Sequence, residues 1–131
     1  MKKIVLGAVF AIAAVASMSA NAATICAGGP AKDGASVATG SFVQVSFTPK
    51  CSANTFVDGV DSSSTLFVVG AGSAKGKKLF VGSSNGGAVC ALAAASDCPS
   101  SGCTAALTTA ATAAEVTAQS ATPATTTCPA T

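Results

Sequence analysis

The sequence predicts a small, mostly β fold that is stabilised by disulfide bonds. Three observations support this prediction. Large apolar residues concentrate in residues 41–92, polar or glycine-rich turns divide that stretch at near-even spacing, and six cysteines follow an N-terminal export signal. Short apolar segments between regular turns are typical of antiparallel sheets. We therefore expect a small antiparallel sandwich or a partly open barrel of about five to seven short strands, with an α+β domain that has one C-terminal helix as the alternative.

Residues 1–22 have the organisation of a signal peptide, with two lysines, an uncharged apolar run over 4–16, and the cleavage sequence Ala20-Asn21-Ala22. The apolar run is shorter than the ~20 residues of a membrane-spanning helix. We therefore expect removal of residues 1–22, no integral membrane span afterwards, and an exported protein in the periplasm or outside the cell, including its surface. Removing 22 of 131 residues leaves 109, which is one small domain.

Two other processing routes fit the N-terminus less well. A lipoprotein signal needs a small residue before its cysteine, and Ile25 precedes Cys26. A type IV prepilin cut after Gly7 normally carries a glutamate where this chain has Ile12. We therefore keep the signal-peptide interpretation.

The expected mature chain is electrically neutral. Once the two leader lysines are removed, five lysines balance four aspartates and one glutamate. A neutral chain exerts no general attraction on nucleic acid or on an anionic membrane surface. We therefore expect no nucleic-acid partner.

The six cysteines predict three disulfides. An even number of cysteines in a small exported domain is typical of a disulfide framework. Zinc is disfavoured because the chain has no histidine and no C-x-x-C pair. Six cysteines allow fifteen pairings, among which the sequence alone does not choose. The set that chain position favours is Cys26–Cys51, which closes a loop worth roughly 3 kcal/mol, together with Cys98–Cys103 and Cys90–Cys128.

We expect five strands within residues 41–92. Residues 41–48 alternate, with Val43, Val45 and Phe47 on one side, which is the pattern of a half-buried strand that Pro49 ends. Asp61-Ser-Ser-Ser and the glycine-rich residues 70–77 separate the later apolar runs. The strongest turn, residues 82–87, contains Asn-Gly and Gly-Gly, which accept positive φ at little cost. The other predicted strands are 55–60, 65–69, 78–81 and 88–92.

The segments on either side of this stretch hold few large apolar residues. Residues 23–40 have the composition of an irregular arm, with a short strand around 36–38. Residues 104–131 form a tail in which alanine and threonine make up 20 of 28 residues. Alanine favours helix and threonine favours extended chain, so a helix over 105–119 stays open. We favour a low-complexity, exposed tail that Cys128 ties back.

The expected domain is therefore 23–103, with its core in 41–92, followed by the tail 104–131. The predicted buried face consists of Val43, Val45, Phe47, Leu66, Val68, Leu79 and Val81, with Phe56 and Phe67 covering its ends or its second side. Only four large apolar residues lie elsewhere in the expected mature chain, too few for a second core. Phe47→Ala should then cost more stability than deletion of 107–122 with Cys128 kept.

The side-chain inventory predicts neither an enzyme nor a cofactor. The chain has no His, Arg, Tyr or Trp, which removes the commonest general base and the bidentate anion ligand. We therefore expect no catalytic residue and no metal site. Asp58 and Asp61 would diverge on a strand and a turn, and they lack the dense acidic pattern of a calcium loop. Residues 70–78, GAGSAKGKK, have five residues between the outer glycines where a phosphate loop has four.

Lys75, Lys77 and Lys78 are the candidate binding residues. Three of the five lysines of the expected mature chain lie in this one turn, where they could contact an anion or the acidic patch of a partner. The alternative is a solvated hairpin tip whose charges discourage edge-to-edge aggregation. We favour the alternative because a few exposed charges specify little.

Two classes of function fit this sequence. The first is a non-enzymatic structural or adhesive component of the bacterial cell envelope or exterior, which assembles with itself or with another envelope protein through β-pairing. The alternative is a small periplasmic or secreted binding module, a ligand carrier or an inhibitor, that uses the disulfide-held loops.

Overall fold

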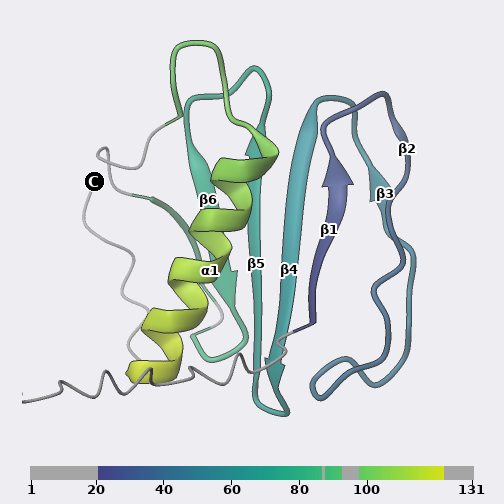
Figure 1. The fold of residues 1–131 in the computed structure, drawn as a ribbon, viewed down its shortest axis with the longest axis vertical. Helices are drawn as coiled ribbons and strands as arrows, with labels where there is room; N and C mark the ends of the chain where they lie inside the picture. The colour runs from purple at the N-terminus through teal and green to yellow at the C-terminus, as the bar shows by residue number, and fades with distance from the viewer. Residues whose placement is uncertain (1–20, 87, 93–97, 123–131) are drawn as a thin grey trace, which may run out of the picture.

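The computed structural model describes residues 21–86, 88–92 and 98–122. Its elements are β1 (Asn21–Ala27), β2 (Lys32–Asp33), β3 (Lys50–Cys51), β4 (Thr55–Ser63), β5 (Leu66–Ser73), β6 (Leu79–Ser83), β7 (Val89–Ala91) and α1 (Ala105–Ala121). Five strands form one antiparallel sheet in the order β1-β4-β5-β6-β7, and β2 pairs separately with β3 (Figure 1). The mostly β, antiparallel fold is confirmed, and the C-terminal helix of the alternative is present as well. The predicted signal peptide falls largely on residues 1–20, which lie outside the described residues.

The N-terminal part of the domain departs from the prediction. Residues 41–48 form a loop, and one backbone bridge joins Val37 to Phe47 where strands over 36–38 and 41–48 were expected. The edge of β4 is occupied instead by β1, which pairs with it antiparallel. Alternating apolar residues form a strand only beside a strand with free hydrogen-bonding groups. The small residues of β1 take that place without showing an apolar alternation.

The four strands predicted in residues 55–92 are present, with shifted ends. β4 and β5 are longer than expected, and β5 continues to Ser73 through residues expected to turn. Gly70 and Gly72 occupy positions in β5 where atoms of neighbouring elements leave no room for a larger side chain. A Cβ on Gly70 would collide with the Thr112 hydroxyl, and one on Gly72 would lie 2.8 Å from a methyl group of Leu79. Glycine within a strand often marks such a close approach.

The helix α1 packs over β4, β5 and β6 (Figure 1), so the interpretation of this segment as an exposed, flexible tail is wrong. Thr104 is the N-cap, and its side chain accepts a hydrogen bond from the Leu107 N–H at 3.3 Å. Thr108 and Thr112 are fully buried. Each donates its hydroxyl hydrogen to the carbonyl four residues earlier, at 3.0 and 2.8 Å. Small side chains with satisfied hydroxyls let the helix lie close to the sheet, so it needs few large apolar residues.

The sheet face under α1 is the predicted buried face. Leu66, Val68, Leu79 and Val81 are all buried, as expected. Near the start of the helix, Leu79, Cys98 and Cys103 form a buried cluster against which other side chains pack, namely Phe56, Leu92, Leu107 and Ala111. The helix therefore completes a core that the strands begin.

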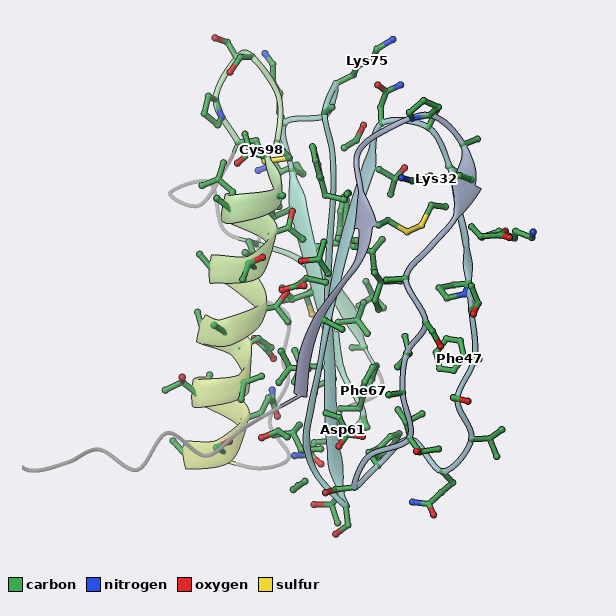
Figure 2. The ribbon with its side chains drawn as sticks, turned by 45° about the vertical axis from the view of Figure 1, so that its right-hand side comes forward. Lys32, Phe47, Asp61, Phe67, Lys75 and Cys98 are labelled. Atoms are coloured by element: carbon green, nitrogen blue, oxygen red, sulfur yellow. A yellow bond between two sulfur atoms is a disulfide. The ribbon has the colours of Figure 1, made fainter. Side chains whose placement is uncertain are left out.

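A second buried cluster lies on the opposite side of the sheet (Figure 2). There residues 28–54 pack beside β1 and β4; from here on we call residues 28–54 the arm, in place of the predicted 23–40. Val43 and Phe67 are partly buried against this cluster. Val45 and Phe47 are 77% and 48% exposed, so their predicted burial is wrong, because the loop that carries them joins no sheet. The core extends beyond 41–92, and we now expect deletion of the helix to cost more than Phe47→Ala. The buried members of this cluster are Ile25, Cys26, Val37 and Cys51.

Two predicted disulfides are confirmed. Cys26–Cys51 ties β1 to the end of the arm, with Cα atoms 5.7 Å apart, and Cys98–Cys103 closes a short loop before α1, with Cα atoms 4.8 Å apart. Cys90 is also disulfide-bonded. Its predicted partner, Cys128, lies outside the described residues.

Candidate functional site

The candidate site is the part of the sheet that neither the helix nor the arm covers. On the face away from α1, the arm packs against β1 and β4. The outward-facing residues of β5, β6 and β7 on this face are apolar or small. Register places Ala71 beside Phe80 and Gly82 between Val69 and Val89. Phe80 is 44% exposed and Val89 is 74% exposed, so an apolar strip stays open to solvent.

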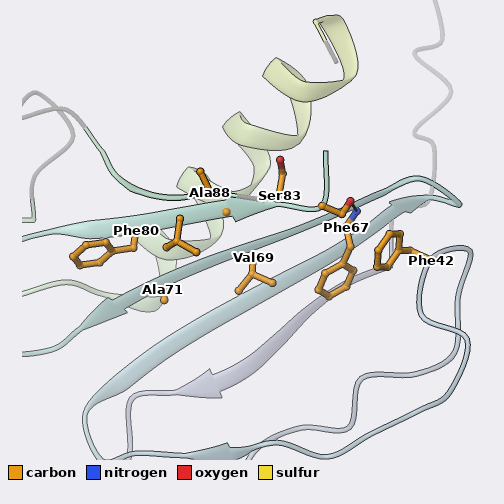
Figure 3. A pocket seen from close by; sticks show the side chains of 10 residues that line it. Phe42, Phe67, Val69, Ala71, Phe80, Ser83 and Ala88 are labelled. Atoms are coloured by element: carbon orange, nitrogen blue, oxygen red, sulfur yellow. Dashed lines mark hydrogen bonds between the residues drawn. The ribbon is translucent and has the colours of Figure 1, made fainter. Parts of the chain in front are cut away.

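This strip is hollowed into two adjoining depressions, which together we call the apolar groove. The first has a volume of about 280 Å³ and the second about 350 Å³, and both are lined by Ala71 and Phe80. Figure 3 shows Phe80, Val69, Phe67 and Phe42 in a row on the side away from α1. The first depression is lined by Phe42, Phe67, Val69, Ala71, Phe80, Gly82, Ser83, Ser84, Ala88 and Val89. The second is lined by Thr55, Ala71, Gly72, Ser73, Gly76, Lys77, Lys78 and Phe80.

Asp61 fixes the closed end of the groove. Its buried carboxylate accepts hydrogen bonds from the backbone N–H groups of Phe42 and Val43, each at 3.0 Å. The Phe42 ring consequently stacks on Phe67, with centroids 5.9 Å apart and an interplanar angle of 21°. A Cβ on Gly40 would collide with the same carboxylate, which explains the glycine beside it. Asp61 is therefore a structural clamp that holds an aromatic wall in place.

The lysine turn forms the other end of the groove. Of the three predicted lysines, Lys77 and Lys78 line it and Lys75 does not. Lys75 and Lys77 are exposed, whereas Lys78 is half-buried and makes a further interaction. The disulfide-closed loop braces this turn, since the Cys98 N–H donates to the Lys77 carbonyl at 2.9 Å. The disulfide-held loop and the lysines therefore meet at one end of one site.

Asp58 does not join Asp61. It is buried on the helix side of β4, and its Oδ2 atom has no hydrogen-bond partner among the described residues. Asp33 forms an exposed ion pair with Lys50 on the arm. Within residues 21–86, 88–92 and 98–122, no group of three or more metal-binding side chains comes together. The carboxylates therefore build no common site in the described part of the chain.

The groove was not recognised in the sequence as a site. Its signal is the alternation in β6, where Leu79 and Val81 point to one face and Phe80 to the other. With Leu79 and Val81 buried in the core, Phe80 points to the other face of the sheet and stays exposed unless another segment covers that face. The sequence has too few large apolar residues to form such a segment.

No protein-family model, curated protein or solved structure matches this chain. Among the described residues, no helix has both the length and the apolarity that crossing a bilayer requires. Two disulfides fit an exported location, where thiols are oxidised.

Proposed function

We propose that this chain is an exported, non-enzymatic binding module that holds an apolar partner in the groove. The observation that carries the proposal is the half-exposed row of apolar side chains on β5, β6 and β7. Contiguous apolar patches on small proteins usually mark a binding surface, because exposing them to water is unfavourable. The second depression, at about 350 Å³, lies at the lower end of the size range of small-molecule pockets, about 300–1,000 Å³, and the first, at about 280 Å³, lies just below it.

The disposition of reactive groups supports a role without catalysis. The chain has no histidine or arginine, and the carboxylate that fixes Phe42, Asp61, is engaged by backbone N–H groups. Asp58 lies beneath the helix, on the other face of the sheet. None of these groups is presented to a molecule in the groove.

A dye-binding experiment tests the proposal. N-phenyl-1-naphthylamine is uncharged and fluoresces in apolar surroundings, so its titration reports on the groove. Phe80→Ser should weaken dye binding about tenfold, which corresponds to ~1.4 kcal/mol of lost apolar contact. Phe47→Ser is the matched control, because Phe47 is exposed to a similar degree outside the groove. Equal loss in both variants, or no dye binding by the unaltered protein, would contradict the proposal.

A structural or adhesive role in the cell envelope is the second candidate. The observation that favours it is the exposure of Val45 and Phe47 on the arm, which a ligand in the groove does not explain. Such residues could add contacts between copies of the chain or with another envelope protein. Sedimentation equilibrium over a wide concentration range tests this role. Association that Val45→Ser and Phe47→Ser abolish would support it, and a monomer throughout would contradict it.

A further inference from the structure

We propose that the partner held in the groove is a single-chain anionic amphiphile, with its acyl chain along β5 and β6 and its headgroup at Lys77. This inference rests on the proposed function and names its ligand class. Charge is distributed unevenly along the groove. One end of the groove is lined by Lys77 and Lys78, whereas the other is closed by Phe42 and Phe67. No carboxylate lines either depression in the described residues. The groove is therefore apolar at one end and cationic at the other.

The two depressions adjoin each other. Ala71 and Phe80 line both of them, so the apolar end and the lysines lie on either side of these two residues. From Phe67 to Ser73 the strand β5 extends about 20 Å, which gives an acyl chain a straight path across the sheet. A compact, exposed ammonium suits a carboxylate, sulfate or phosphate group, because it acts as a point charge without a fixed geometry. Lys77 is the exposed lysine at that position.

The same distribution of charge disfavours two other occupants. A second copy packed groove to groove about a two-fold axis would place Lys77 against either the apolar Phe42 end or the Lys77 end of the other copy, and neither end offers a carboxylate in its lining. An anionic bilayer is attracted by clusters of about four to eight basic residues, and this turn has three lysines in a chain whose expected mature form is neutral. A single amphiphile satisfies both ends of the groove at once.

The test compares three probes of equal chain length below their aggregation thresholds: laurate, 1-dodecanol and dodecyltrimethylammonium. Each is used to displace N-phenyl-1-naphthylamine at low ionic strength. Laurate should bind about threefold to fivefold more tightly than dodecanol, as expected for one exposed ion pair, and the cationic probe should bind most weakly. The preference for laurate should shrink at high salt because exposed charges are screened.

Two lysine variants locate the headgroup. Lys77→Gln should abolish the preference for laurate, so that laurate and dodecanol bind this variant with equal affinity. Lys75→Gln is the matched control, since Lys75 lies in the same turn but does not line the groove. It should leave both affinities unchanged. Neither side chain is buried, so both variants should fold.

The possible results separate the inference from the proposed function. Equal binding of laurate and dodecanol, or a preference for laurate that Lys77→Gln leaves intact, would overturn the inference while the groove remains a binding site. Absence of displacement by any probe, together with absence of dye binding, would overturn both. A dimer whose formation Phe80→Ser abolishes would make a second copy the occupant. Flotation with phosphatidylglycerol vesicles without binding of monomeric laurate would make it a membrane surface. Either of these last two results would overturn the inference.

Discussion

The two faces of the five-stranded sheet are covered in different ways. On one face α1 lies so close to the strands that Gly70 and Thr112 are in contact distance, and Leu66, Val68 and Leu79 are buried beneath it. On the other face the arm covers β1 and β4 and reaches Phe67 at the start of β5, and an apolar groove stays open over the rest of β5 and over β6 and β7. Apolar residues of one sheet are therefore in two different environments: those under the helix are buried in the core, and those opposite it on β6 and β7 remain partly exposed to solvent.

The largest difference in stability should appear between truncations of two adjacent residues that point to opposite faces of the sheet. Leu79 is buried beneath the helix and Phe80 is half-exposed on the opposite face. Leu79→Ala should lower the free energy of unfolding by about 3 kcal/mol, because it leaves a cavity in the core. Phe80→Ala should lower it by about 1 kcal/mol or less, since much of its ring is already in contact with water. Urea unfolding of both variants measures the two values, and equal losses would mean that the groove belongs to the core.

The next effect concerns the close approach of the helix. Gly70→Ala adds a methyl group that collides with Thr112, so it should lower the free energy of unfolding by about 1–3 kcal/mol. Gly29→Ala is the control, because a Cβ there meets no atom within 4 Å. It should be neutral or stabilising by less than about 1 kcal/mol. If thermal unfolding shows no difference between the two variants, α1 does not pack as tightly as described.

A smaller loss of stability is expected when the hydrogen bonds of the Asp61 carboxylate are weakened. Asp61→Asn removes the charge that holds the N–H groups of Phe42 and Val43, and we expect a loss of about 1.5 kcal/mol in the free energy of unfolding. It should also weaken dye binding, because Phe42 is released from Phe67. The exposed Asp33→Asn should change stability by less than about 1 kcal/mol. Unchanged dye affinity in Asp61→Asn would show that Phe42 forms no part of the binding site.

The smallest expected effect has the opposite sign. Asp58 is buried under the helix, and its Oδ2 atom has no hydrogen-bond partner within the described part of the chain, which is an unfavourable environment for a carboxylate. Asp58→Val should therefore raise the free energy of unfolding by about 1 kcal/mol, because a β-branched apolar residue suits a covered strand. Differential scanning calorimetry checks this, and a lower melting temperature would imply that Asp58 has a partner we have not identified.

The sequence predicted the parts of the fold that depend on local patterns. Turns of polar residues and glycine separate β4, β5, β6 and β7, so the approximate positions of these strands could be predicted from composition. The pairing of segments that lie far apart in the sequence could not be predicted in this way. The run containing Val45 and Phe47 alternates as a strand does, yet β1, made largely of small residues, takes the place beside β4. Likewise, α1 has few large apolar residues, and its burial depends on Gly70, which belongs to a strand 42 residues before Thr112.

The candidate site was predicted only in part, for the same reason. Three lysines in one turn were recognisable, but only the course of that turn decides that Lys77 lines the groove and Lys75 does not. The apolar floor comes from residues on alternate positions of three strands, whose register fixes it. The Asp61 carboxylate joins a strand to a loop 19 residues earlier, and no local sequence pattern predicts such a contact.

The most direct test of the central claim, that the uncovered face binds a ligand, is a titration of the isotopically labelled protein with laurate, followed by amide chemical shifts. The binding account predicts shifts that saturate and that cluster on the groove, at Val69, Ala71, Phe80 and Lys77, with Thr108 and Thr112 on the helix and Asp33 on the arm unaffected. Shifts confined to the helix or the arm, or no saturable change at all, would contradict it.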